Sequence, residues 1–203
     1  MQLKRVVITG IGTINPIGNN IAEYFGNLDM GLSGAAPITR FDTTLFKTKF
    51  ACEIKDYDPA KYGIDRKEER KLDRFTQYAF IACDEAIKDC AIDTEKINPD
   101  RVGVILGTGI GGIDTLFNEI VGYCEGGNNP RFSPFLIPKM IPDIAPGMIS
   151  MKYGFRGPNY TTVSACASST HAMIDAFNTI RLGKADIMVT GGSEAGITIP
   201  SVG

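Results

Sequence analysis

Cys166, in the stretch TTVSACASSTHAMIDAF (161–177), is the side chain in this sequence best placed for covalent chemistry. It follows a β-branched run and precedes a helical pattern, so we expect it at a strand-to-helix junction. Ligands of α/β proteins gather beyond the carboxyl ends of the strands, and a helix N-terminus favours a thiolate over a thiol. Small neighbours leave room for a substrate and leave backbone N–H groups free to bind an oxyanion. The pattern indicates a nucleophilic thiol; the alternative is an inert, buried one.

The single histidine, His171, lies five positions after Cys166. That spacing places it more than one helical turn away and rotated off the sulfur's side. We therefore expect a structural or pocket-lining imidazole rather than a general base for the thiol.

The five cysteines are odd in number and widely scattered, with no CxxC pair. This pattern excludes a disulfide framework and a zinc site and indicates a reducing, cytoplasmic location. Cys83 and Cys90 fall on the same helical pattern and are interpreted as small core residues. Cys52 and Cys124 carry no chemical signature.

The elements that must position Cys166 follow from hydrophobic periodicity. Short β-branched or apolar runs predict buried strands at 5–12, 101–107, 159–165 and 185–192. Spacings of three and four predict helices at 21–28 with one buried face, 68–90, 114–120 with a capped start, 141–154 and 173–182. Pro142 and Pro146 mean that the helix at 141–154 is kinked or starts late. The alternation of strands and helices predicts an α/β fold with a mainly parallel sheet.

Composition and local sequence argue against several classes of function. A net charge of -2 and a pI near 5.5 argue against a nucleic-acid binder. No run approaches the roughly 18 apolar residues of a membrane span, and the start shows no signal peptide. The stretch TGIGTINPIG has a misplaced third glycine and no acidic residue after a following strand, so a dinucleotide site is not expected.

Seven motifs occur in the order found in β-ketoacyl-acyl carrier protein synthases: VVITGIG, KLDRFTQYA, GTGIGG, SPFLIP, YGFRGP, VSACASSTHA and ADIMVTGGSEA. The chain most resembles the elongating enzyme of type II fatty acid synthesis, over essentially all of residues 1–203. The resemblance implies a thiolase-like fold, layered α-β-α-β-α when complete, of which this chain is the N-terminal half. It also implies a homodimer that needs neither a cofactor nor a metal.

The resemblance assigns roles to individual residues. Cys166 would take an acyl group from acyl carrier protein as a thioester, with its own backbone N–H as one oxyanion donor. Malonyl carrier protein would then lose CO2 and condense with that thioester. Ile110 and Phe135 would line acyl tunnels, Phe135 by reaching across the dimer; for both, plain core packing is the alternative.

A basic cluster precedes or opens the predicted helix at 68–90. By resemblance it would dock the acidic carrier protein, together with a second position further along the chain; the residues are Arg66, Lys67, Arg70, Lys71 and Arg131. The alternative is a solvated face, because Glu68 and Glu69 interleave with the cluster.

One part of the family pattern is missing. A pair of histidines, a lysine and a Gly-Phe-Gly loop belong to the second half of these enzymes, whereas this sequence ends at Gly203. The chain is thus either a fragment or one half of a two-polypeptide enzyme, and condensation needs the other half. Two rivals remain: a thiolase acting on coenzyme A thioesters, and a non-catalytic chain-length-factor-like partner, in which the cysteine is replaced. Acyl chain length, and fatty acid or polyketide supply, stay open.

Overall fold

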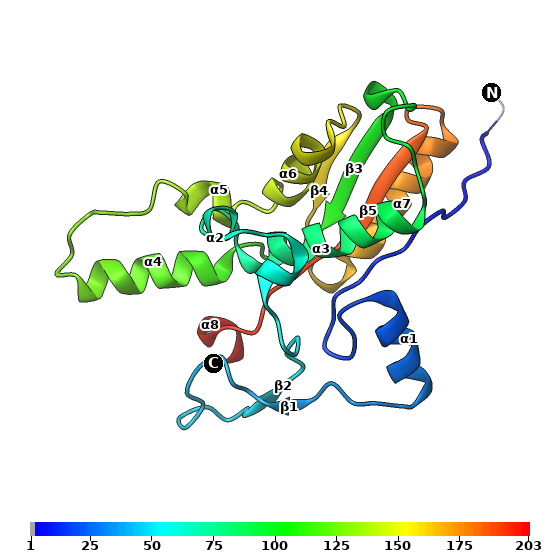
Figure 1. Cartoon of the computed structure of the whole chain (residues 1–203). Helices are drawn as coiled ribbons and strands as arrows, with labels where there is room; N and C mark the ends of the chain where they lie inside the picture. The colour runs from blue at the N-terminus through cyan, green and yellow to red at the C-terminus, as the bar shows by residue number, and fades with distance from the viewer. Residues whose placement is uncertain (1–2) are drawn as a thin grey trace.

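The computed structural model describes residues 3–203, and a three-stranded parallel sheet of order β4-β3-β5 lies at its centre (Figure 1). Its strands are β3 (Val102–Gly107), β4 (Asn159–Thr162) and β5 (Ile187–Gly192). The helices are α1 (Ile21–Asp29), α2 (Arg66–Glu69), α3 (Arg74–Asp89), α4 (Ile113–Glu125), α5 (Leu136–Met140), α6 (Ile144–Tyr153), α7 (Ser168–Arg181) and α8 (Ile199–Val202), with short 3-10 turns at Pro59–Tyr62, Pro99–Arg101 and Ala165–Ala167. A two-stranded antiparallel ribbon pairs β1 (Ala36–Pro37) with β2 (Phe50–Ala51). The predicted parallel α/β sheet is confirmed.

The central strand β3 is buried on both faces, which explains its unbroken apolar run. Val104 and Leu106 pack into the core formed with α3 and α6, and Ile105 packs on Ala172 and Ala176 of α7. Figure 1 shows α3 and α6 on one face of the sheet and α7 on the other. The result is a three-layer α/β/α unit in which α7, the helix after Cys166, is anchored to the middle strand.

The predicted helix at 68–90 is confirmed over most of its length as α3, but its first residues belong to α2, because the chain breaks between α2 and α3. Asp73 is the N-cap of α3 and accepts a hydrogen bond from the Phe75 N–H at 3.3 Å. The same buried carboxylate accepts hydrogen bonds from the backbone N–H and the hydroxyl of Thr115 in the first turn of α4. Asp73 therefore starts one helix and holds the start of another, a double role that periodicity does not reveal.

The predicted N-terminal strand at 5–12 is wrong: this segment is extended, and within residues 3–203 it pairs with no strand. Val7 and Ile8 are 60% and 87% exposed. An apolar groove of about 350 Å³, lined by the segment together with β5 and α7, separates it from the sheet edge. A β-strand needs a backbone partner, and across this groove the segment has none.

Two helices differ in detail from expectation. α1 forms as predicted but buries no residue, and Phe25 and Leu28 are about half exposed. α4 begins after Gly112 with no side-chain cap, contrary to the expected capped start.

The structure decides between the two alternatives for the proline-containing helix in favour of a late start. α6 begins at Ile144, after Pro142, and carries Pro146 in its first turn, where a missing N–H costs nothing.

Two ion pairs, both made by Asp186, lie at the end of the sheet opposite Cys166. Asp186, just before β5, binds the Arg101 guanidinium at 2.9 Å and the Lys4 ammonium at 2.9 Å. Hydrogen bonds from Arg101 and then Lys4 hold the pKa of Asp186 well below its usual range, so it is charged at neutral pH. These two ion pairs connect the start of β5 to the turn before β3 and to the N-terminal segment.

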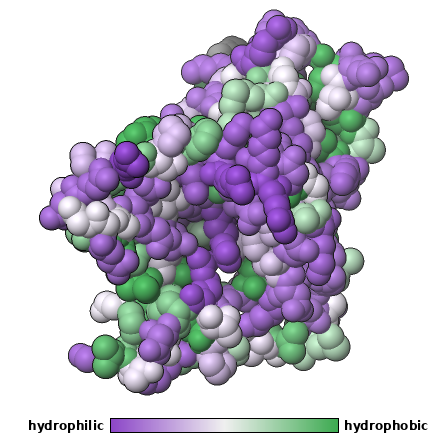
Figure 2. Space-filling view, turned by 60° about the vertical axis from the view of Figure 1, so that its left-hand side comes forward, coloured by the Kyte–Doolittle hydropathy of each residue, from purple (hydrophilic) through white to green (hydrophobic). Residues whose placement is uncertain are grey.

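The surface seen in Figure 2 is largely hydrophilic, with hydrophobic side chains in scattered patches. No helix among residues 3–203 combines the length and the apolar character that a membrane crossing requires.

Candidate active site

Cys166 lies just beyond the carboxyl edge of the sheet. β4 ends at Thr162, and the short helical turn Ala165–Ala167 leads from it directly into α7. The thiol is exposed to solvent. The predicted strand-to-helix junction is confirmed, except that the strand is three residues shorter than expected, and Cys166 is not buried in this structure.

A network of hydrogen bonds holds the turn that carries Cys166. The buried Ser168 hydroxyl donates to the Ala165 carbonyl at 2.7 Å and accepts from the Ser164 N–H at 2.8 Å. The Thr162 hydroxyl donates to the Ser168 carbonyl at 2.7 Å. Ala165 adopts a φ of +50°, in the left-handed region that costs a residue with a side chain about 1–3 kcal/mol. Such strain persists only where the surroundings impose it, and it is found mostly at functional sites.

The backbone around Cys166 can stabilise negative charge. Among residues 3–203, no acceptor pairs with the Cys166 N–H, whereas the next N–H, of Ala167, donates to the Ser164 carbonyl at 3.1 Å. The first turn of α7 begins two residues later, and its N–H groups carry a partial positive charge. An unpaired N–H beside a nucleophile at a helix start is the arrangement that binds a tetrahedral oxyanion.

The end of β3 presses against this turn. A Cβ at Gly107 would lie only 2.2 Å from the Ser168 carbonyl carbon, so only glycine permits the contact. The close approach fixes the height of α7 above the sheet, and with it the position of Cys166.

His171 is paired with the chain just before Cys166. Its Nδ1 lies 2.6 Å from the hydroxyl oxygen of Ser164, two residues before Cys166. The structure therefore agrees with the expectation of a structural imidazole, and adds that its partner is the strained turn itself.

The other cysteines differ from Cys166 in their surroundings. Burial raises the pKa of Cys83 to about 12, so this thiol is protonated and unreactive at neutral pH, as a core residue should be. Cys90 is partly buried at the C-cap of α3, and its thiol donates to the Ile87 carbonyl at 3.1 Å. Cys52 and Cys124 are exposed, and all five cysteines are free.

The two expected tunnel residues lie in different places. Ile110 is half exposed in the loop after β3. In that loop, a Cβ at Gly109 would stand 3.7 Å from the Ala165 Cα, so the loop is next to the turn that carries Cys166. Phe135 is instead the N-cap residue of α5, with the Lys71 ammonium 5.9 Å from its ring centre. Figure 1 shows α4 and α5 projecting from the sheet as an arm.

The basic cluster lies on α2 and the turn after it, and not at the start of the long helix as one expectation had it. Its four residues and Arg131 are exposed, and among residues 3–203 none of the five joins an ion pair. Asp65 caps α2, and hydrogen bonds from the Glu68 and Lys67 N–H groups lower the pKa of its carboxyl. The cap orients the cluster without neutralising it.

Sequence reasoning missed Glu194, the second residue after β5. Its carboxylate accepts hydrogen bonds from the loop after β3, at the Gly109 and Ile110 N–H groups and the Thr108 hydroxyl. The sequence does carry a signal for it: a carboxylate two residues after the glycines that end one predicted parallel strand, in a chain where another predicted strand ends in a glycine-rich loop.

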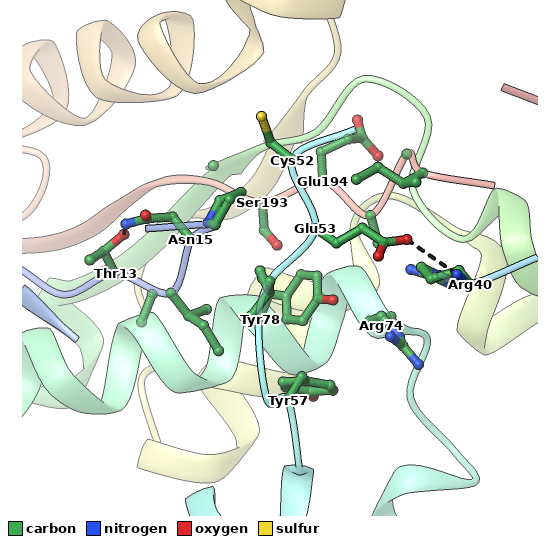
Figure 3. Close-up of a pocket in the computed structure, with 18 of the residues that line it drawn as sticks. Thr13, Asn15, Arg40, Cys52, Glu53, Tyr57, Arg74, Tyr78, Ser193 and Glu194 are labelled. Carbon is green, nitrogen blue, oxygen red and sulfur yellow. Dashed lines mark hydrogen bonds between the residues drawn. The ribbon is translucent and has the colours of Figure 1, made fainter. Parts of the chain in front are cut away.

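Glu194 also borders a polar cavity of about 520 Å³ (Figure 3). Arg74 of α3 stacks 5.4 Å from the Tyr57 ring centre, and burial raises the pKa of Tyr57 and of Tyr78. Burial would also raise the pKa of Glu53, but hydrogen bonds from Thr39 and the Arg40 N–H outweigh it and keep the carboxylate charged. Cys166 does not line this cavity.

Within residues 3–203, no group of three or more potential ligands is arranged to hold a metal ion.

The fold and the junction define a class: a parallel α/β unit that presents an exposed cysteine at the start of a crossover helix. The β-ketoacyl synthase N-terminal domain model matches residues 3–202. The chain therefore belongs to the β-ketoacyl synthase family, and it corresponds to the N-terminal domain of that family.

Two curated relatives are named 3-oxoacyl-[acyl-carrier-protein] synthase 2. The protein of Staphylococcus aureus is 45% identical over 97% of this chain and 47% of its own length. The protein of Synechocystis is 42% identical over 98% of this chain and 47% of its own length. The chain thus spans about half the length of the curated relatives it matches.

Solved structures confirm the thiolase-like α/β fold. A β-ketoacyl synthase from Burkholderia phymatum superposes with a TM-score of 0.83 at 27% identity, over 98% of this chain and 49% of that one. A type II polyketide ketosynthase solved in complex with its acyl carrier protein superposes with a TM-score of 0.80 at 26% identity, over 98% of this chain and 53% of that one.

Proposed function

We propose that this chain is the nucleophile-bearing half of a 3-oxoacyl-[acyl-carrier-protein] synthase of type II fatty acid synthesis. The observation that carries the proposal is the exposed Cys166 thiol at the start of α7, with its own N–H unpaired in the described structure. The names of the relatives support the substrate class. The retained cysteine speaks against a non-catalytic partner.

The proposed reaction has two stages. The Cys166 thiolate attacks the carbonyl carbon of an acyl-carrier thioester, and the collapsing tetrahedral intermediate expels the carrier thiolate, which takes up a proton. Malonyl carrier protein then loses CO2, and its carbanion attacks the Cys166 thioester. The Cys166 thiolate leaves, and the product is a 3-oxoacyl carrier protein longer by two carbons. The Cys166 N–H stabilises the oxyanion of each tetrahedral intermediate.

The second stage requires a second half-domain, supplied either by the same polypeptide or by another. The apolar groove beside β5 supports this, because a free strand edge and the exposed Val7 and Ile8 are surfaces that a further strand would cover. Residues 1–203 are then the N-terminal half of one ketosynthase domain.

The functional test is product formation by the completed synthase. With acyl and malonyl carrier protein, it is expected to release one CO2 for each 3-oxoacyl product, measured by mass spectrometry of the carrier protein. Acyl coenzyme A offered in place of the acyl carrier protein is the discriminating arm. A strong preference for coenzyme A would favour the thiolase alternative, and neither product nor acyl adduct would favour the non-catalytic partner.

The basic cluster on α2 is the proposed docking surface for the acidic carrier protein, with Arg131 as a second contact. Reversing two of its charges, Lys67→Glu with Arg70→Glu, is expected to lower kcat/KM for acyl carrier protein about tenfold at low salt, because rim charges steer association. The loss should shrink as salt rises. Steady-state assays against salt concentration measure both effects.

Lys96→Glu is the matched control for this charge reversal, since Lys96 is an exposed lysine far along the chain from the cluster. The small thioester acyl-N-acetylcysteamine is the substrate control, because it lacks the acidic carrier. Equal losses with the carrier and with the small thioester would argue against docking at this surface.

A homodimer and a cytoplasmic location complete the proposal. β4 is an edge strand of the sheet, with Tyr160 exposed on it, so a second copy could extend the sheet at that edge. Five free cysteines suit a reducing compartment.

A further inference from the structure

Glu194 binds one loop with a single oxygen. Its Oε2 accepts hydrogen bonds from the Gly109 N–H at 2.6 Å, the Ile110 N–H at 3.1 Å and the Thr108 hydroxyl at 3.2 Å. All three donors belong to the loop that follows β3, more than eighty residues earlier in the chain. Charge-assisted hydrogen bonds of this kind are among the stronger ones in proteins.

The base of Glu194 is rigid. The preceding residue, Ser193, donates its N–H to the Gly107 carbonyl at 3.0 Å and its hydroxyl to the Phe75 carbonyl of α3 at 2.6 Å. The following residue, Ala195, is buried. The backbone on both sides of Glu194 is therefore fixed in the core, while the Glu194 carboxylate binds the loop after β3.

The loop after β3 lies between Glu194 and the turn that carries Cys166. A Cβ at Gly109 would meet Glu194 Oε2 at 2.9 Å and would stand 3.7 Å from the Ala165 Cα. The Thr108 N–H donates to the Thr162 carbonyl at the end of β4 at 3.3 Å. The loop therefore borders the turn that carries Cys166, and its Ile110 side chain is half exposed.

The contacts of Glu194 favour positioning over proton transfer. Three neutral donors bind the Oε2 atom of its carboxylate, and among residues 3–203 no cation pairs with the carboxylate. The Gly109 and Ile110 N–H groups are used by Glu194, so they are not free to bind an oxyanion, in contrast to the Cys166 N–H.

We propose that Glu194 is a positioning residue: its carboxylate holds the Gly109–Ile110 backbone against the Ala165–Cys166 turn and so sets where an acyl chain lies beside the sulfur, without contacting the reacting atoms. The inference rests on the proposed function and adds a residue that governs acyl-chain selectivity. Removing the carboxylate frees two N–H groups and loosens the loop, so acyl groups of different length are bound with less discrimination.

The test compares Glu194→Ala and Glu194→Gln in the completed synthase. For Glu194→Ala we expect KM for the preferred acyl carrier protein to rise about tenfold and the kcat/KM ratio between long and short acyl groups to fall at least threefold, with kcat changed less. Glu194→Gln retains one neutral acceptor oxygen and should lie between this variant and the wild type. The rate of Cys166 alkylation by iodoacetamide, followed by peptide mass spectrometry, should stay within about twofold in both.

Glu85→Ala is the matched control. The Glu85 carboxylate likewise accepts two backbone N–H groups, from Thr13 and Ile21 at 2.8 Å each, but in the N-terminal part of the chain. It should leave chain-length selectivity unchanged. If Glu194→Ala does not fold, Glu194→Gln decides alone. Wild-type KM and selectivity in the folded Glu194 variants would overturn the proposal, whereas a wild type that never acylates Cys166 would overturn the proposed function instead.

Discussion

Replacement of Cys166 by serine is expected to abolish the stable acyl adduct on the completed synthase and to lower kcat by about a thousandfold or more. The thiolate is the attacking group, and a serine hydroxyl at the same place is a far weaker nucleophile without a base to activate it. The Nδ1 of His171 is paired with the Ser164 hydroxyl. The change is nearly isosteric at an exposed site, so Tm should move by less than about 2 °C. Intact-protein mass spectrometry and calorimetry measure the two effects.

Cys124→Ser is the control for this substitution, because Cys124 is also an exposed, free thiol but lies on α4. It should acylate and condense as the wild type does. A Cys166→Ser variant that still forms an adduct at the wild-type rate would place the nucleophile elsewhere.

Gly107→Ala is expected to cost about 3 kcal/mol of stability and to suppress acylation. The new Cβ would lie 2.2 Å from the Ser168 carbonyl carbon and 2.4 Å from its oxygen, so the first turn of α7 must move. Because Ser168 also holds the Ala165–Cys166 turn, the nucleophile would move with it. Urea unfolding gives the free-energy loss, and the rate of acyl adduct formation gives the effect on the site.

Gly122→Ala provides the opposite result. Gly122 lies within α4, and a Cβ there would meet no atom within 4 Å. Alanine is the better helix former, so this variant should be more stable by about 0.5–1 kcal/mol and should acylate normally. Equal stability for the two variants would show that the contact of β3 with α7 does not constrain the turn.

The hydrophobic pattern of consecutive segments was enough to predict the three strands of the sheet and the junction at Cys166. β3 is buried on both faces by helices of this same chain, so its apolar run reports its true environment. Small residues between a β-branched run and a helical repeat likewise indicate the position of the cysteine, because the strand, the turn and the helix are consecutive in the chain.

Features that depend on distant partners could not be predicted in this way. The N-terminal run has strand composition, but within residues 3–203 it forms no ladder with a strand, so it stays extended and unpaired. The helix break at Asp73 depends on Thr115, and the grip of Glu194 on Gly109 joins residues 85 apart. Periodicity reports burial and period; it does not report which side chain will meet which loop.

The most direct test of the account locates the acyl group. The completed synthase is incubated with carrier protein bearing an isotopically labelled acyl chain, and the digested protein is mapped by mass spectrometry. We expect the label on the peptide that contains Cys166, as a thioester released by hydroxylamine. Condensation that proceeds with the label on another residue, or with none on Cys166, would contradict the central claim.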